Sequence, residues 1–496
     1  MSATKAPEID KPDLQHGLKR RLTSPQVAMI ALSGALGTGL FLGSSKTIAL
    51  AGPATVVSFI LSGLCALAVV WALAEVVTVH PVPGGHGAVA ASYLGPLAGY
   101  IARWNFAVTM MLAVGAEVVA SATYLRYWFP DLPLWLGTAL CSSVIVVLNL
   151  ASVHLYGTSE YWFSMIKVTA IIVFIVLGFY LIFFGTDATE PVGWGNLTQH
   201  DGFAPYGIMG VLSAAVIAVF SFGGIENVSV AAAESQNPRR DVPRAAHTMI
   251  WRLLIFYVFA ITVVVTLQPW TQTASSDGSI DKSPFVSVLE ILGVSAAANI
   301  MNAILLIAAL SAANGCLYTA SRMIHSLAGD NLAPRIAERT NAKGAPRTAV
   351  LFATVGMFAA AAVALFAPGE AFGWFMGVAT IGILVTWVMS MLTVMAFRKR
   401  REELGLPHSP ARLWLVPVIP WLIIAVSIAV YLALFKLSFP AFVMGMIYVP
   451  TLLISFQILK RMGKVKEPVN LAALELQELT EARIQDRAQV SGDSKS

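Results

Sequence analysis

Long apolar runs separated by short polar loops make up most of this 496-residue chain. A helix that crosses a bilayer needs about 20 apolar residues, and scanning for such runs predicts roughly twelve transmembrane helices. Their expected ranges are 26–48, 53–79, 97–124, 133–152, 161–184, 207–232, 247–269, 296–321, 348–367, 371–397, 413–436 and 440–459. The pattern therefore predicts an all-α polytopic membrane protein.

The composition agrees with this prediction. Hydrophobic residues make up 57% of the chain and charged residues 12%, whereas about a quarter of a soluble protein is charged. Residues 1–24 are polar and have no apolar core, so we expect no cleavable signal peptide. All three cysteines lie in apolar segments, which favours small buried hydrophobes over a disulfide framework or a metal site: Cys65, Cys141 and Cys316.

Positive charge gathers in alternate loops. If twelve helices alternate in direction, one side carries "KRR" (19–21), "NPRRDVPR" (237–244), "RKRRE" (398–402) and "KRMGKVK" (460–466). The positive-inside rule makes this side cytoplasmic, with both termini inside a plasma or inner membrane. The net charge of +5 then reflects topology, and we expect no nucleic-acid partner.

Two of the apolar segments are interrupted by glycine. The first contains "SGALGTGLFLG" (33–43) and the sixth contains "VFSFGGIENVS" (219–229). Close helix packing explains one glycine-rich helix well, but interruptions in two corresponding segments indicate inverted repeats and a binding site near the middle of the membrane. Unwinding frees N–H groups that suit a carboxylate and C=O groups that suit an ammonium, which favours a transporter of a zwitterion such as an amino acid.

Four motifs resemble those of a known family: "GTGLFLGSS" (37–45), "FSFGGIE" (220–226), "AAAESQNPRRDVPRA" (231–245) and "NGCLYTASRM" (314–323). The chain is similar, over roughly residues 15–460, to the amino acid permeases of the amino acid–polyamine–organocation (APC) superfamily. Within it, the chain resembles the bacterial amino acid transporter family, which includes GABA, aromatic and lysine permeases. One departure is "PVPGGHGAVAASYLG" (81–95), where the family usually carries a Gly-Ser-Phe type sequence at the cytoplasmic gate.

The resemblance implies a 5+5 inverted repeat, with broken first and sixth helices, followed by two extra helices. The expected division is a cytoplasmic N-terminal segment (1–24), a first repeat of helices 1–5 (25–184), a second repeat of helices 6–10 (185–397), helices 11–12 (398–460) and a cytoplasmic tail (461–496).

The resemblance also implies a substrate site at the two interruptions. In the first segment it implies a bend that binds the substrate carboxylate, and in the sixth a carbonyl stretch that holds the amine, with the Phe220 ring covering the substrate. The expected substrate-binding residues are Ser33, Gly37, Thr38, Gly39, Phe220, Ser221 and Gly223. Taken without the resemblance, the glycines are also explained by close helix packing, and a phenylalanine in a membrane helix is usually a core residue or a lipid contact.

Three ionisable residues inside the spans are candidates for proton coupling or gating, because intramembrane charges are costly: Lys167, Glu117 and Glu226. On the predicted range, Lys167 is the seventh residue of its span, about 9 Å from the cytoplasmic end, where snorkelling is an equal explanation. The resemblance implies instead that Lys167 replaces a sodium ion, bridges helices 1 and 8, and loses and regains a proton. For Glu117 and Glu226, pairing with a cation is the structural alternative.

Two further glutamates lie at helix ends. Glu75 is explained equally by snorkelling or by a gate contact, and Glu234 with the arginines after it predicts a structural cap. The sequence contains no phosphate loop, nucleotide fingerprint, nucleophile elbow or metal-ligand cluster. We therefore expect no enzymatic activity, no cofactor, no metal and no drive by ATP.

The sequence predicts a proton-coupled symporter that imports a neutral amino acid or GABA by alternating access. Its partners would be the substrate, protons and the lipid bilayer, with no obligate protein partner evident. A proton-independent exchanger and a symporter for aromatic or basic amino acids are alternatives that the residues leave open. A membrane-embedded enzyme or nutrient sensor is a remote alternative.

Overall fold

The fold is helical throughout the part of the chain that the structure describes. The computed structural model describes residues 22–151, 153–185, 190–273, 283–291, 295–341 and 345–493. Within these ranges, nine helices are long and apolar enough to cross a membrane, and Leu134–Leu150 and Gly207–Ser221 are shorter apolar helices. The all-α polytopic class is confirmed, while the count of twelve spans stays a prediction. Most of the predicted N-terminal segment lies outside the described residues.

The helices follow the predicted segments closely. In chain order they are α1 (Ser24–Ala35), α2 (Thr38–Phe41), α3 (Ser44–Ala51), α4 (Thr55–Val79), α5 (Gly85–Leu94), α6 (Pro96–Arg126), α7 (Leu134–Ala151), α8 (Val153–Phe183), α9 (Gly207–Ser221), α10 (Asn227–Ala231), α11 (Pro238–Leu267), α12 (Trp270–Thr273), α13 (Pro284–Ile291), α14 (Ser295–Gly329), α15 (Arg347–Ala353), α16 (Val355–Phe366), α17 (Ala371–Glu403), α18 (Val418–Leu437), α19 (Phe439–Arg461) and α20 (Leu471–Asp493). Short 3-10 helices lie at η1 (Gly52–Ala54), η2 (Gly195–Leu197), η3 (Ala232–Glu234) and η4 (Arg335–Glu338).

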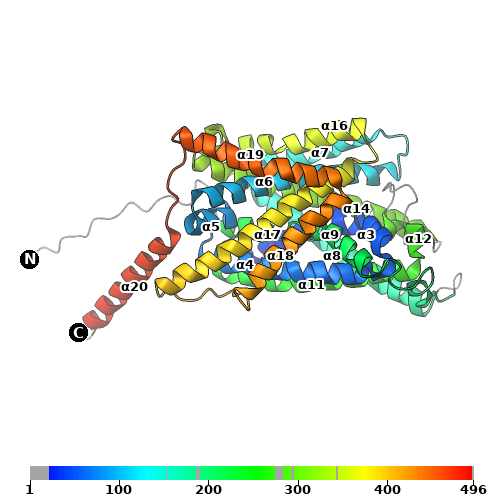
Figure 1. The fold of residues 1–496 in the computed structure, drawn as a ribbon, viewed down its shortest axis with the longest axis horizontal. Coiled ribbons are helices and arrows are strands. Elements are labelled where there is room, and N and C mark those ends of the chain that lie inside the picture. Colours follow the sequence, from blue (N-terminus) through cyan, green and yellow to red (C-terminus); the bar gives the residue numbers. More distant parts are fainter. Residues whose placement is uncertain are drawn as a thin grey trace, which may run out of the picture.

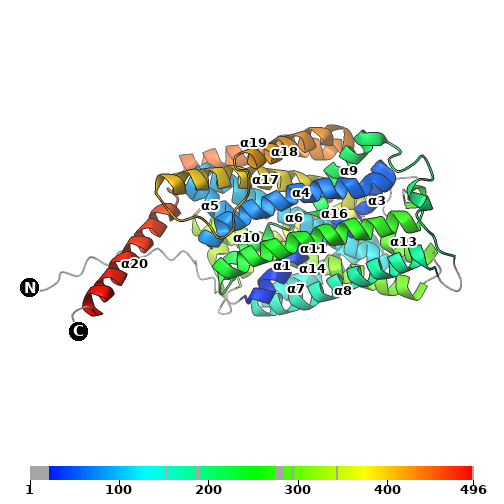
Figure 2. The same ribbon diagram turned by 90° about the horizontal axis from the view of Figure 1, so that it is seen from below.

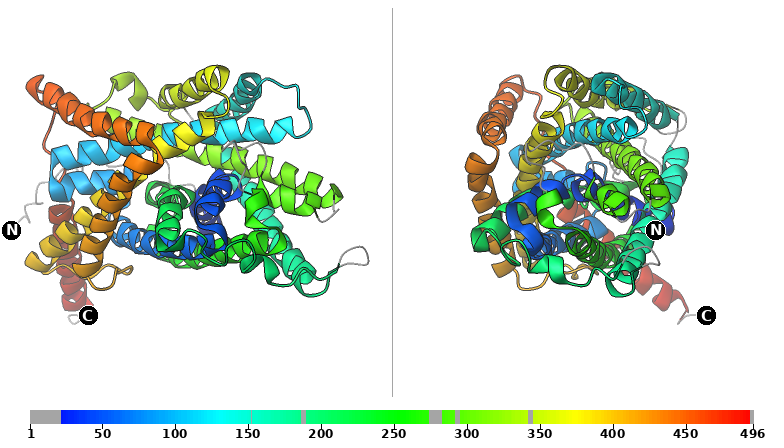
Figure 3. Two further views of the ribbon diagram at one scale, coloured as in Figure 1. Left: turned by 45° about the vertical axis from the view of Figure 1, so that its right-hand side comes forward. Right: turned by 90° about the vertical axis from the view of Figure 1, so that its right-hand side faces the viewer.

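The bundle has two distinct ends. Helices α5 and α20 lie at one end, which we call the α20 end, and α3, α12 and α13 lie at the opposite end (Figures 1 and 2). Helix α20 extends away from the bundle. Helices α18 and α19 lie at the edge of the bundle, where they pack mainly on α17 and on each other (Figure 3).

Helix α6 is the central element of the core. It packs against α14, α17, α5, α7 and α16, and most of its side chains are buried. One of its polar side chains ties it to α17: the Asn105 side-chain amide donates to the Gly382 carbonyl at 2.8 Å and to the Thr386 hydroxyl at 2.9 Å. Because α6 is fixed on several sides, any side chain that it presents to the first and sixth segments has a rigid support.

The first and sixth segments are both broken, where their glycines are concentrated. The first segment stops at Ala35 and resumes as α2 at Thr38, after Gly37 with extended backbone angles (φ −117°, ψ −162°). The sixth stops at Ser221 and resumes as α10 at Asn227, through a turn in which Gly224 has φ +96°. Glycine adopts that left-handed angle without the steric cost of a side chain.

Candidate substrate and coupling site

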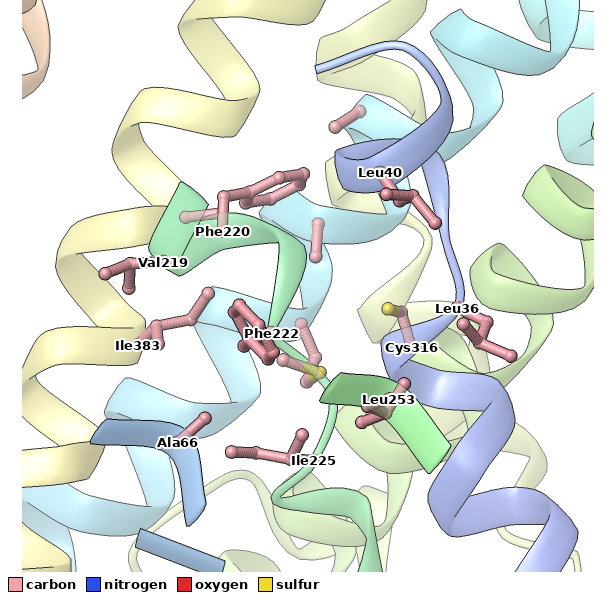
Figure 4. Close-up of a cluster of buried hydrophobic side chains, with 14 of the residues drawn as sticks. Leu36, Leu40, Ala66, Val219, Phe220, Phe222, Ile225, Leu253, Cys316 and Ile383 are labelled. Carbon is pink, nitrogen blue, oxygen red and sulfur yellow. The ribbon is translucent and has the colours of Figure 1, made fainter. Parts of the chain in front are cut away.

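The two breaks lie against each other. A Cβ atom added at Gly39 would come within 2.6 Å of the Ser221 Cα. Figure 4 shows Leu36 and Leu40 on either side of the first break, with Phe220 and Phe222 on the second. Between the breaks lies a cavity of about 20 Å³ lined by Gly37, Gly39, Met110, Ala113, Glu117, Phe220, Ser221, Gly223, Gly224, Cys316 and Ile383. This is about the space of one water molecule, so an amino acid enters only if the lining moves apart.

The backbone freed at the sixth-segment break is satisfied from inside the protein. Glu226 accepts a hydrogen bond from the Gly224 N–H at 2.9 Å and another from the Trp387 indole N–H of α17 at 2.8 Å. The Tyr257 hydroxyl of α11 donates to the Ser221 carbonyl at 2.7 Å. Because buried backbone groups need partners, these contacts fix the shape of the break and tie it to α11 and α17.

The break in the first segment is held by a carboxylate. The Thr38 N–H points at Glu117 of α6, with 3.2 Å to Oε1 and 3.4 Å to Oε2. A Cβ atom at Gly37 would lie 2.6 Å from Glu117 Oε1, so glycine at this position gives the carboxylate room. At the other end of α2, the Ser283 hydroxyl donates to the Phe41 carbonyl at 2.6 Å.

Lys167 is completely buried. The depth of Lys167 in the membrane stays a prediction, but helix α8 begins at Val153, eight residues before the predicted span 161–184. The lysine lies 14 residues from that end, about 21 Å at 1.5 Å per residue. Its Nζ donates to the Ser311 hydroxyl of α14 at 3.0 Å and lies 3.9 Å from Glu160 Oε1. The contact with Ser311 joins Lys167 to α14, the eighth predicted helix, which is one of the two helices that the lysine is predicted to bridge. The other is the first helix, where the side chains of residues 31–35 lie outside the described residues.

A buried polar cluster continues from Lys167 toward the start of α8. Glu160, which is 1% exposed, accepts from the Ser311 hydroxyl at 2.5 Å and from the Asn314 side-chain amide at 3.2 Å. Asn314 in turn accepts from the Asn149 side-chain amide of α7 at 2.6 Å. Sequence reasoning missed Glu160 because it lies just before the predicted span, although its spacing of seven from Lys167 puts both on one helix face.

The predicted substrate residues mostly come together. Gly37, Gly39, Phe220, Ser221 and Gly223 line the cavity, as does the predicted coupling residue Glu117, and Thr38 contributes its N–H. Lys167 and Glu226 do not line it, and the side chain of Ser33 lies outside the described residues. Two lining residues outside the predicted set, Gly224 and Cys316, lie in the family motifs, whereas three apolar ones carry no motif signal: Met110, Ala113 and Ile383.

The predicted amine-binding carbonyls are partly engaged. The Phe220 carbonyl accepts from the Gly223 N–H at 2.9 Å, and the Ser221 carbonyl accepts from Tyr257. A substrate ammonium at this break would share these oxygens or bind a neighbouring one, since a carbonyl has two lone pairs.

Ion pairs join neighbouring helices at the α20 end. Glu75 binds Arg398 through two contacts of 2.7 Å, and Glu234 binds Arg322 at 3.1 Å. Glu75 is 2% exposed, so it does not snorkel; it ties α4 to α17. Glu234 forms a structural contact, as expected, although its partner comes from α14 and not from the arginines that follow it.

The departing motif "PVPGGHG" forms a tight elbow at the same end. Gly84 and Gly85 have φ of +86° and +48°, and a Cβ at Gly85 would lie 2.6 Å from the Ser229 carbonyl oxygen. His86 Nδ1 lies 2.9 Å from the Ser229 hydroxyl. That hydroxyl already donates to the Glu226 carbonyl at 2.7 Å, so His86 must be the donor. Burial lowers the pKa of His86 to about 4.

Comparison with known proteins identifies the family. The amino acid permease family matches residues 26–463. The chain is 38% identical over 410 residues to the gamma-aminobutyric acid permease of Bacillus subtilis (strain 168), covering 83% of this chain and 86% of that protein. It is 35% identical over 443 residues to the aromatic amino acid transport protein AroP of Escherichia coli (strain K12), covering 89% and 95%. The chain therefore belongs to the amino acid permease family of the APC superfamily.

Proposed function

We propose that this permease is a proton-coupled symporter that imports a neutral amino acid or GABA, with the substrate held between the α1–α2 and α9–α10 breaks. The relatives named above transport gamma-aminobutyric acid and aromatic amino acids by their names, and these two substrate classes are the leading candidates here.

The observation that carries the proposal is the contact of Glu117 with the Thr38 N–H. It identifies this amide, freed by the break, as a donor that binds a carboxylate. A substrate carboxylate would use the same donor, and two carboxylates at one site repel each other. Substrate binding therefore favours the protonated, neutral form of Glu117. One proton is taken up with each substrate, which is the requirement for symport.

The remaining lining favours a neutral substrate. Apart from Glu117 it consists of glycines, Ser221, the Cys316 thiol and the apolar side chains of Met110, Ala113, Phe220 and Ile383. A basic side chain would need its own carboxylate, and the one in the cavity already faces Thr38. An aromatic substrate would need Phe220 and Ile383 to move further apart than a small neutral one. These apolar residues would set side-chain specificity.

Lys167 and Glu226 would act outside the cavity. Glu226 bonds to both the Gly224 backbone and Trp387, so a change in its protonation would loosen the sixth-segment break from α17. Lys167 would carry a proton at the position where a sodium ion would otherwise join neighbouring helices. Both roles couple a charge change to movement of a broken helix, which is how a local event opens or closes a site.

The proposal includes a membrane orientation and a repeat. Basic loops following α17 and α19 lie at the α20 end, which would be cytoplasmic by the positive-inside rule. The adjacent breaks in the first and sixth segments support two inverted repeats of five helices, over 25–184 and 185–397, with α18 and α19 as the two extra helices.

The test uses purified protein in sodium-free proteoliposomes. An inward proton gradient should drive accumulation of the substrate found by a competition panel of twenty amino acids and GABA. Glu117→Gln keeps the hydrogen-bond acceptor for Thr38 but cannot titrate. It should lose gradient-driven accumulation while retaining counterflow. If Glu117→Gln accumulates substrate as well as the wild-type protein does, the role of Glu117 is refuted. If the wild-type protein itself shows counterflow but no response to the proton gradient, the exchanger is favoured.

A further inference from the structure

The buried cluster around Glu160 has no role in the function proposed so far. It joins three helices: Glu160 and Lys167 of α8, Ser311 and Asn314 of α14, and Asn149 of α7. All five side chains are at most 5% exposed. Burying a lone charge is very costly, so a charge cluster kept inside an apolar bundle needs internal compensation.

The contacts form a continuous path for a proton. Lys167 Nζ donates to the Ser311 hydroxyl at 3.0 Å, and that hydroxyl donates to Glu160 Oε1 at 2.5 Å. A proton that leaves the ammonium for Ser311 displaces the hydroxyl proton onto Glu160. One proton moves, and the pair changes from ammonium and carboxylate to amine and carboxylic acid, both neutral. The direct separation of 3.9 Å between Lys167 Nζ and Glu160 Oε1 makes the hydroxyl the natural bridge.

The other groups around Lys167 do not replace Glu160. Other ionisable groups that act on it include Glu117 of α6 and the Cys316 thiol of α14. Helices α1 and α7, which flank α8, have no charged residues. Glu117 is engaged with Thr38 at the substrate cavity. Glu160 is the carboxylate that lies within ion-pair distance of the ammonium, at 3.9 Å.

We propose that Glu160 is the counter-ion and proton acceptor of Lys167, and that Ser311 relays the proton between them. Glu160 then takes part in the coupling step, although it is set apart from the substrate cavity. It lies seven residues nearer the start of α8, about 10 Å along the helix. Asn314 donates to its second oxygen, and Asn149 in turn donates to Asn314 and orients it. The inference rests on the proposed proton coupling through Lys167.

The experiment measures pH-gradient-driven accumulation and its dependence on internal pH in sodium-free proteoliposomes. Glu160→Gln removes the anion that favours the ammonium, so the pH profile should move toward acid and accumulation should fall at least about tenfold. Counterflow, which needs no net release of protons, should fall much less. Glu234→Gln is the matched control, because it removes another buried carboxylate from an ion pair, with Arg322, without touching Lys167. It should leave the shape of the profile unchanged.

Two serine variants keep the test decisive if Glu160→Gln fails to fold. Ser311→Ala removes the relay without changing charge, and Ser311→Thr retains a hydroxyl. Slower gradient-driven uptake in the alanine variant, with recovery in the threonine variant, supports the relay. The proposal is overturned if Glu160→Gln and Ser311→Ala both keep the wild-type uptake and pH profile. If Glu160→Gln fails to fold, wild-type uptake and pH profile in Ser311→Ala alone overturn it. If wild-type protein itself shows no response to a proton gradient, the proposed function fails, which is a separate outcome.

Discussion

Replacing Gly39 with alanine should damage the site more than any other single added methyl group near it. The position is where α2 and α9 approach most closely, since a Cβ there would lie 2.6 Å from Ser221 Cα and 3.0 Å from both its N and Oγ. Two of these three atoms are backbone. A rotamer change cannot remove the clash, so the two broken helices must separate.

The expected magnitude follows from that geometry. Carbon atoms pack at about 3.5–4.0 Å, so the backbones must part by roughly 1 Å. Overpacking of this kind costs about 1–3 kcal/mol, which corresponds to roughly 5- to 150-fold in an equilibrium constant. Substrate affinity should fall by that factor. Because the obstacle is backbone, thermal stability should fall as well.

Gly37→Ala gives a sharp comparison. Its added Cβ would meet Glu117 Oε1 at 2.6 Å, which is the end of a side chain, and Ala312 Cβ at 3.2 Å. Glu117 can rotate away, but the Thr38 N–H then loses its carboxylate. We expect Gly37→Ala to be nearly as stable as wild type but to show altered pH dependence of binding. Gly369→Ala is the control, because nothing lies within 4 Å of its Cβ position.

The assay combines equilibrium binding of labelled substrate to purified protein with thermal unfolding in the same detergent. Gly39→Ala should lower both the substrate affinity and the melting temperature. Gly37→Ala should mainly alter the pH dependence of binding, and Gly369→Ala should change none of these. Wild-type affinity and stability in Gly39→Ala would show that the two breaks do not touch as described and would refute the reasoning. Equal behaviour of the two site glycines would refute the distinction between backbone and side-chain obstacles.

Three further outcomes are expected. Lys167→Arg should lose gradient-driven uptake in sodium-free proteoliposomes, because arginine keeps its proton; wild-type accumulation would contradict a proton-carrying lysine. His86 has its pKa lowered to about 4 by burial, so its share of the stability is complete above about pH 6.5 and is lost as pH falls toward 4. The loss of stability between pH 7.5 and 5, measured by thermal unfolding, should therefore be smaller by about 2 kcal/mol in His86→Gln than in wild type, and unchanged in the exposed-site control His408→Gln. Glu75→Gln should cost about 3 kcal/mol of stability by leaving Arg398 without its buried partner, and a melting temperature equal to wild type would contradict this.

Much of the fold could be predicted from the apolar pattern because the bilayer imposes a length on every span. The expected segment 97–124 became α6 (Pro96–Arg126), and 371–397 became the start of α17 (Ala371–Glu403). The two breaks were predictable for a related reason, since adjacent glycines such as Gly223 and Gly224 are costly in an uninterrupted helix. What the pattern missed lies in the loops. The elbow at Gly84 and the helix α5 after it depend on contacts with α10 and α14 that no local signal reveals.

Within the site, the residues with unusual backbone requirements were predictable and the contact partners were not. Gly37 and Gly39 are required by close approaches, and such glycines leave a mark in the sequence. The pairing of Glu117 with the Thr38 N–H joins positions 79 residues apart, and that of Trp387 with Glu226 joins positions 161 apart. Hydropathy carries no information on such pairs. Met110, Ala113 and Ile383 are equally silent, because an apolar residue that lines a cavity looks the same in a sequence as one that faces lipid.

The start of the helix that carries Lys167 bears on how intramembrane charges are interpreted. The apolar run begins at 161, just after the polar turn that contains Glu160. That turn is helical, so α8 begins eight residues before the apolar run, about 12 Å along the helix. The carboxylate that compensates the lysine is itself polar, so it interrupts the apolar run and makes the helix look shorter in hydropathy. The start of a helix inferred from hydropathy is thus least reliable where an intramembrane charge has a partner inside the protein. In such helices, residues spaced three, four or seven apart lie on one face, and this spacing is the better guide to the partner of a buried charge. By this criterion Glu160 is predicted to lie on the same face as Lys167.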